Sequence, residues 1–348
     1  MVPTFNFRQS RLAILSGLTA ALLAAAAEAA ESSWRLTPDL IVKRQWLSES
    51  DPSPGDWYSF GIDAYKNFSL NGKNFAALTV QVYGWHVQNR IRKPGVLEGL
   101  EDSRLISKVS TINFNLSGDG KFNFLVGHPE LPYGLEVPVS TNETLRTLLT
   151  PRDTGLKLDW GLGANGTING LSYATTLTRG SGFEWDSKAK DGKAPWALAG
   201  RIGTATDQQG FLPAEGIGLS FFLGNTLQAD QTRVERWRIA GDVVHYSGPV
   251  GILAQLSYGQ TDKRDTINAY AELNRSTASE TCVAYLQFKS YNEAYSSGWE
   301  HALSVSAGIR YAVAPHSTFS LQISRDVSGF FATPEQSIID AQMRFRFD

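Results

Sequence analysis

The residues best suited to metal binding or nucleophilic catalysis are few in this chain, and their spacing forms no recognisable site. The histidines show no pattern such as His-Glu-x-x-His, and no Gly-x-Ser-x-Gly turn precedes a helical segment. Cys282 is the only cysteine, so no internal disulfide can form. We therefore predict no metal, no cofactor and no enzyme activity, with a triad assembled in space as the open alternative. The histidines are His86, His128, His245, His301 and His316.

Basic side chains are the second group that could do chemistry, by attracting anions. Two of them lie on one long, apolar-rich connection between residues 128 and 154, and others recur at every second position of alternating segments. Residues two apart share one face of an extended strand. The candidate anion-contacting set is Arg146, Arg152, Lys157, Arg236, Arg238 and Arg310.

The first thirty residues read as an export signal. Arg8 and Arg11 precede an apolar stretch over 12–27, and Ala27-Glu28-Ala29 fits a small-x-small cleavage site. We expect a cleaved signal peptide over 1–30, cut after Ala29 or Ala30, followed by one domain over 31–348. No later stretch has 18 consecutive apolar residues, so no transmembrane helix is expected. The net charge of −2 and the absence of a basic run argue against a nucleic-acid partner.

The rest of the chain alternates apolar and polar residues with a period of two, which indicates strands. Over 250–259 one apolar residue, Leu253, falls on the polar face, and over 216–224 the exception is Phe222. A soluble sandwich and a membrane barrel both produce such alternation. Strand lengths of about ten residues, a polar face rich in Gly, Ser, Thr, Asn and Gln, and aromatics near strand ends favour the barrel.

We count about sixteen strands. They lie near 34–47, 57–66, 75–87, 107–116, 122–127, 155–162, 167–178, 195–204, 216–226, 234–246, 250–261, 267–274, 281–291, 299–311, 317–326 and 336–347. The count falls to fourteen if the two weakest, 34–47 and 267–274, are dropped. With sixteen strands, the tight turns at 117–120, 163–166, 247–249 and 314–316 follow strands four, six, ten and fourteen, all on one side, as in outer-membrane barrels. With fourteen, the turn at 117–120 would fall on the long-loop side.

The connection over 128–154 is the third external loop in this count. Its leucines, Leu145, Leu148 and Leu149, need burial, which folding into the barrel against the inner wall provides. A short helix is expected over 142–149, with Ser140 or Thr141 as its cap. We therefore predict an all-β, transmembrane antiparallel barrel with this loop folded into the lumen.

Two short motifs resemble a known family. The run Phe124-Leu125-Val126-Gly127, followed by Pro132-Tyr133-Gly134-Leu135-Glu136, is similar to a strand and loop start in phosphate-selective porin O and P relatives of the bacterial porin superfamily. The resemblance implies a homotrimer whose pore favours anions. That family's arginine ladder and lysine cluster have no residue-by-residue match here.

The favoured function is a porin in the outer membrane of a Gram-negative bacterium, passing small hydrophilic solutes by passive diffusion. The six basic residues named above would line its constriction and prefer anions, phosphate among them. The competing expectation is that lumen charges form crosswise pairs that only solvate the wall. A structural or assembly barrel without an open pore and an outer-membrane enzyme stay as alternative functions.

Overall fold

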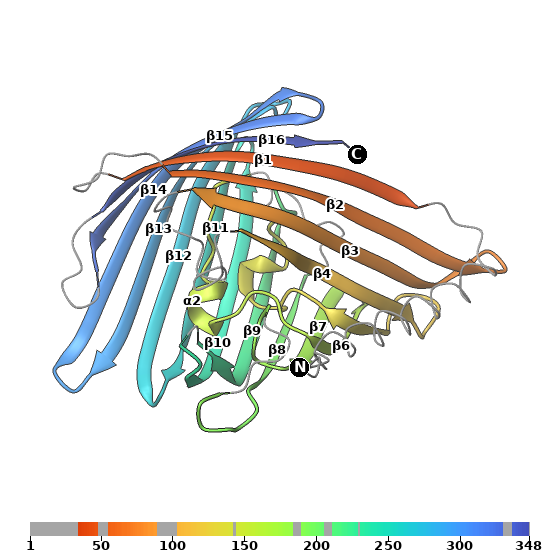
Figure 1. The fold of residues 1–348 in the computed structure, drawn as a ribbon, viewed down its shortest axis with the longest axis horizontal. Coiled ribbons are helices and arrows are strands. Elements are labelled where there is room, and N and C mark those ends of the chain that lie inside the picture. The colour runs from red at the N-terminus through yellow and green to blue at the C-terminus, as the bar shows by residue number, and fades with distance from the viewer. Residues whose placement is uncertain are drawn as a thin grey trace, which may run out of the picture.

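The described residues form a closed antiparallel barrel of sixteen strands, in which each strand pairs with its sequence neighbours and β1 pairs with β16 (Figure 1). The computed structural model describes residues 34–47, 55–88, 103–141, 144–183, 189–204, 211–228, 230–329 and 336–347. The expected signal peptide over 1–30 lies outside these ranges. No helix within them is long and apolar enough to cross a membrane.

The strand bounds follow the alternation closely except at the sixth strand, which was expected over 155–162. They are β1 (Arg35–Leu47), β2 (Gly55–Leu70), β3 (Lys73–Gln88), β4 (Ser103–Asn115), β5 (Asn123–His128), β6 (Gly161–Ile168), β7 (Leu171–Thr178), β8 (Trp196–Thr204), β9 (Gly216–Leu227), β10 (Arg233–Ser247), β11 (Val250–Thr261), β12 (Arg264–Ser276), β13 (Cys282–Tyr295), β14 (Gly298–Ala314), β15 (Ser317–Ser328) and β16 (Ser337–Arg346). The count of sixteen is confirmed, and the two weakest predicted strands are β1 and β12.

One hairpin was predicted in the wrong place. Residues 163–166, expected as a turn, lie inside β6, and the turn is Asn169-Gly170, where both residues have positive φ. Asn-Gly is the dipeptide that suits a two-residue hairpin turn. The glycines upstream serve strand packing instead, since a Cβ on Gly163 would lie 2.4 Å from the carbonyl oxygen of Thr175.

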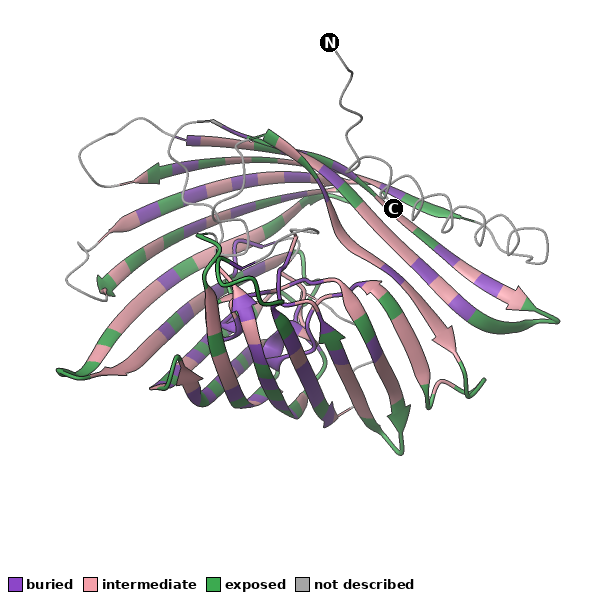
Figure 2. Cartoon of the chain, turned by 60° about the horizontal axis from the view of Figure 1, so that its bottom comes forward, coloured by how far each residue is buried: buried purple, intermediate pink, exposed green. Residues whose placement is uncertain are grey.

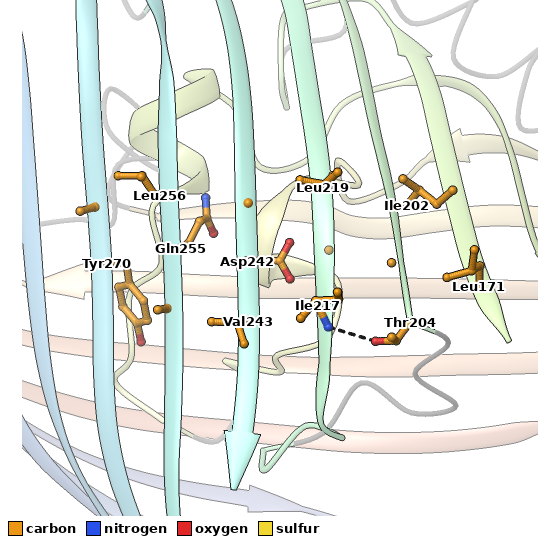
Figure 3. Close-up of a pocket in the computed structure, with 15 residues that line it drawn as sticks. Leu171, Ile202, Thr204, Ile217, Leu219, Asp242, Val243, Gln255, Leu256 and Tyr270 are labelled. Atoms are coloured by element: carbon orange, nitrogen blue, oxygen red, sulfur yellow. Dashed lines mark hydrogen bonds between the residues drawn. The ribbon is translucent and has the colours of Figure 1, made fainter.

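Side chains face as the alternation predicts. Leu219 and Leu256 are exposed on the outer surface, whereas Gln255 and Ser306 are buried on the inner one. The banding of buried and exposed positions along the strands is visible in Figure 2. Ile202, Leu219 and Leu256 also border an apolar groove on the outside of the wall (Figure 3). An outer face of this kind suits contact with lipid hydrocarbon.

Ion pairs on the lumen side reinforce the seam between the first and last strands. Asp39 of β1 accepts two hydrogen bonds from Arg344 of β16, and both side chains are almost fully buried. Further along the seam, Lys43 lies 2.9 Å from Asp340. These contacts join residues about 300 positions apart, and so they act only when the barrel closes.

Asp39→Asn should lower the free energy of unfolding by about 3–5 kcal/mol, because the substitution leaves the buried Arg344 without its carboxylate. The matched control is Asp56→Asn, whose partner Arg44 has a side chain 52% exposed and which should cost less than about 1 kcal/mol. Urea unfolding in lipid vesicles, followed by tryptophan fluorescence, measures both. Equal losses would show that the pair does not stabilise the seam.

Candidate pore constriction

The segment between β5 and β6, residues 129–160, turns inward at the end of β5 and is called loop L3 from here on. Gly127 has φ +136°, and a Cβ there would lie 2.0 Å from the carbonyl oxygen of Ser110, so only glycine allows this bend. The two ends of L3 then pair with each other, since the Leu131 amide donates to the Lys157 carbonyl at 2.8 Å. Figures 1 and 2 show L3 inside the ring of strands, as predicted.

Apolar packing holds L3 against one part of the inner wall. Leu148 and Leu149 are buried against Val244 of β10 and Leu253 of β11, and Leu145 is also buried. Near the start of L3, Leu131 and Tyr133 pack with Phe222 of β9. The two apolar residues that broke the strand alternation, Phe222 and Leu253, are therefore the inward side chains that receive the loop.

Backbone contacts fix the first half of L3 on the same wall. The Gly134 amide donates to the Ser220 hydroxyl and the Leu135 amide to the Gln255 side chain, both at 2.9 Å. Gly134 begins the 3-10 turn η2 (Gly134–Glu136) with φ +56°, and a Cβ there would lie 2.3 Å from the Gln255 side-chain oxygen. Glycine thus permits the close approach of loop and wall.

The expected helix over 142–149 is wrong for the residues that can be described. Residues 144–149 are irregular, and the helix is instead α2 (Thr150–Thr154). Pro151 suits the first turn of a helix because it needs no amide donor there. Gly155 ends the helix in the left-handed conformation at φ +75°. The backbone around the leucines before α2 is set by their packing against the barrel wall and not by a helical repeat.

Arg146 is a docking residue at the far end of L3. Its guanidinium donates to both oxygens of Glu272 on β12, at 2.9 and 2.6 Å, and neither side chain is exposed. It also donates to the Phe211 carbonyl at 2.7 Å. Tyr270, Asn274 and Gln287 donate to the same carboxylate. A positive charge held in this way is locally neutralised.

Lys157 is neutralised within L3 itself. Its ammonium forms an ion pair with Glu136 and lies 3.7 Å from Glu130. Burial disfavours the charged form, but the two carboxylates outweigh it and raise the pKa of Lys157 above its ordinary value. The charge of Lys157 also acts on Lys108 of β4.

Arg152, Arg236 and Arg238 gather on one side of α2. The charges of Arg152 and Arg238 both act on Arg236, as do those of Asp262 and Glu293, and a Cβ on Gly155 would lie 2.1 Å from the Arg236 guanidinium. Arg236 donates to the hydroxyl of Thr226, a neutral partner. Arg238 lies 4.0 Å from Asp153. The exposed Arg152 has its guanidinium 5.2 Å from the centre of the Tyr291 ring.

Arg310 does not join that group. It lies on β14 near the tight-turn side of the barrel, where its guanidinium is 4.7 Å from the centre of the Phe211 ring. The six predicted residues therefore fall into three places: Arg152, Arg236 and Arg238 beside α2, Arg146 and Arg310 around Phe211, and Lys157 within L3.

Sequence reasoning named Asp153 only as an acid that could offset the basic residues of the loop, and it missed Glu272. Glu272 and Asp153 are both buried and hold L3 to the wall, the latter through Asn268 and Tyr133. Burial raises the pKa of Asp153, although Asn268 and Arg238 oppose that shift. The available signal was the alternation of β12, which places Tyr270, Glu272 and Asn274 on one polar face. No cluster suited to a metal ion occurs among the residues that can be described.

No family model and no curated protein matches the chain. Solved structures do match. OprB of Pseudomonas putida is 9% identical with a TM-score of 0.66, covering 90% of this chain and 94% of its own. An anion-selective porin from Comamonas acidovorans is 10% identical with a TM-score of 0.64, covering 91% and 100%. The chain has the porin fold. OmpT, an outer membrane protein of Vibrio cholerae solved in a trimer form, is 11% identical with a TM-score of 0.62, covering 91% and 99%.

Glu272→Gln should release the far end of L3 from the wall. The change leaves the Arg146 charge buried without a counter-charge, which costs about 3 kcal/mol or more, roughly a hundred-fold in the docking equilibrium. Hydrogen exchange read by mass spectrometry should show faster exchange over residues 144–149. The control is Glu293→Gln, whose partner Arg264 is 40% exposed. Unchanged protection in Glu272→Gln would contradict the docking role.

Proposed function

We propose that the protein forms a water-filled channel across the outer membrane, through which small hydrophilic solutes diffuse passively. The observation that carries this proposal is the presence of partly exposed charges inside the barrel. The side chains of Glu130 and Arg346 are 33% and 25% exposed, and that of Lys43 is 15% exposed. Charges in a dry interior cost several kcal/mol each, so these groups indicate a lumen that admits water.

The position of L3 supports a narrowed channel rather than a plug. Its contacts with the wall concentrate on β9, β10 and β11, with Arg146 and Thr147 reaching β12 and β13. The opposite part of the wall carries its own ion pairs, in which Arg344 and Arg346 bond Asp39 and Asp63. A solute would pass between these two charged surfaces.

We further propose that the channel prefers anions, because Arg152, Arg236 and Arg238 lie together beside α2. The acids that act on them are Asp153, Asp262 and Glu293, and Glu293 is already paired with a fourth basic residue, Arg264. Two predicted contributors, Arg146 and Lys157, are neutralised by their own carboxylates and should add little. A few net positive charges in a narrow passage shift the local potential by several kT. The anion-selective porin of similar fold is consistent with this preference. Phosphate is one anion of this class and is tested beside chloride.

The localisation and the oligomeric state of the protein are inferred from the same fold. The apolar outer surface fits outer-membrane lipid, and export requires the signal peptide expected over 1–30. A homotrimer is the proposed assembly, supported by the trimer form of a protein with the same fold. Chemical cross-linking of the purified protein in detergent tests the assembly directly, and a monomer alone would contradict it.

Planar-bilayer recording across a salt gradient tests the channel and its preference. The wild type should show conductance steps and a reversal potential of anion sign in potassium chloride and in potassium phosphate. Arg152→Gln with Arg236→Gln should move the reversal potential toward cations. The effect should shrink at 1 M salt, where the Debye length is about 3 Å.

The matched control is Arg325→Gln, which removes an exposed arginine from β15 and should leave the reversal potential unchanged. Cation preference in the wild type, or no shift in the double variant, would refute the anion preference alone. A silent bilayer would refute the channel and favour a structural barrel.

A further inference from the structure

The described part of the connection between β8 and β9 lies on the side opposite the external loops and contacts groups inside the lumen. The connection follows an even-numbered strand, as do the tight turns Asn71-Gly72 and Asn169-Gly170, so it lies on the periplasmic side in the proposed orientation. Its described part, residues 211–215, is called the strap. The Phe211 ring centre lies 4.5 Å from the guanidinium of Arg146 and 4.7 Å from that of Arg310.

The strand order and the contacts of Phe211 together indicate that the strap reaches into the lumen. Phe211 precedes β9, whereas Arg310 belongs to β14, five strands away around the wall. Five steps of about 4.8 Å make at least about 24 Å along the sheet. The five residue steps from Phe211 to Gly216 span at most about 18 Å when fully extended, so only the side chains of Phe211 and Arg310 bring the two strands into contact. Because Phe211 also contacts Arg146 of L3, which lies inside the ring of strands, the strap runs inward.

Contacts fix the strap at both ends. At its start, the Phe211 carbonyl accepts a hydrogen bond from Arg146 at 2.7 Å. At its end, the Glu215 carboxylate accepts from the Tyr246 amide at 2.6 Å and lies 3.0 Å from His245. Pro213 between them is buried. Arg146 is itself held by Glu272, so the strap and the tip of L3 support each other.

We propose that the strap forms a second narrowing of the channel, on the periplasmic side of L3, and that Phe211 sets its width. This inference rests on the proposed channel function. The ring is uncharged and the charge of Arg146 is neutralised by Glu272, whereas Arg310 keeps its guanidinium beside the ring. Phe211 itself therefore selects solutes by size, and its removal leaves the charges of Arg146 and Arg310 in place.

Phe211→Ala should raise the single-channel conductance and speed the swelling of liposomes in larger neutral sugars, while the reversal potential stays that of the wild type. Phe211→Tyr, which keeps the ring, should behave as the wild type does. Phe221→Ala is the matched control, because it removes a phenylalanine that is exposed on the outer face of β9. Wild-type conductance and wild-type sugar exclusion in Phe211→Ala would overturn the proposal.

A loosened L3 is a second route to higher conductance, and hydrogen exchange over residues 144–149 separates the two. Wild-type protection of residues 144–149 in Phe211→Ala supports a narrowing by the ring itself. Lost protection would mean that the strap only holds L3 in place, which overturns the proposal.

The position of the strap inside the lumen is tested without measuring conduction. In a Cys282→Ser background, Phe211→Cys with Arg310→Cys should be joined by a short bis-maleimide. If the two cysteines fail to cross-link in a folded barrel, the proposed strap is overturned even if the channel conducts. If they cross-link but the bilayer shows no conductance, only the channel function is refuted.

Discussion

The closure of the sheet is the constraint on which the rest of this structure depends. In lipid hydrocarbon no water is available to backbone amides and carbonyls, so a spanning sheet must leave no open edge. Here β1 and β16 pair from Asp39 with Arg346 to Leu47 with Ile338. Closure divides the side chains into an outer, apolar set that suits lipid and an inner set that must solvate or pair its charges. The buried Asp39–Arg344 pair lies on this inner side.

Once an inner surface exists, its charges decide what the lumen can do. Arg146, Lys157 and Arg344 each lie against a carboxylate, and Arg201 pairs with Asp242 on the wall. Ion pairs between lumen charges thus account for much of the inner surface. The sequence had suggested such pairing as the alternative to an anion preference. The group beside α2 differs because it brings three arginines together, while Glu293, one of the acids that act on them, pairs with Arg264. The proposed anion preference therefore depends on where the basic residues lie in the lumen and not on how many there are.

L3 stays inside because the wall is shaped to receive it. Phe222 and Leu253 point inward where a water-facing wall would carry polar residues, and each packs with apolar loop residues. Gly134 and Gly155 let the loop backbone approach Gln255 and Arg236. Loop and wall are consequently one packed unit, and the strap extends that unit toward the other mouth of the barrel through Arg146 and Phe211.

The sequence by itself determined the class of fold, the strand count, the facing of the strands and the burial of the L3 leucines. These features depend on local alternation and on the need of apolar side chains for a surface, both of which are visible residue by residue. It misplaced the turn after β6, because several glycines competed for that role and only strand pairing distinguishes a turn glycine from one that permits close strands.

The tertiary structure alone decided which charges meet. Arg146 and Glu272 are 126 residues apart, and Asp39 and Arg344 are 305 apart. Their partnership depends on the register of distant strands and on the path of L3 across the lumen. No local pattern carries that information, since an arginine that binds a solute and one that holds a loop have the same side chain. The contact of Phe211 with Arg310 was likewise hidden, because it depends on where β14 lies in the closed ring.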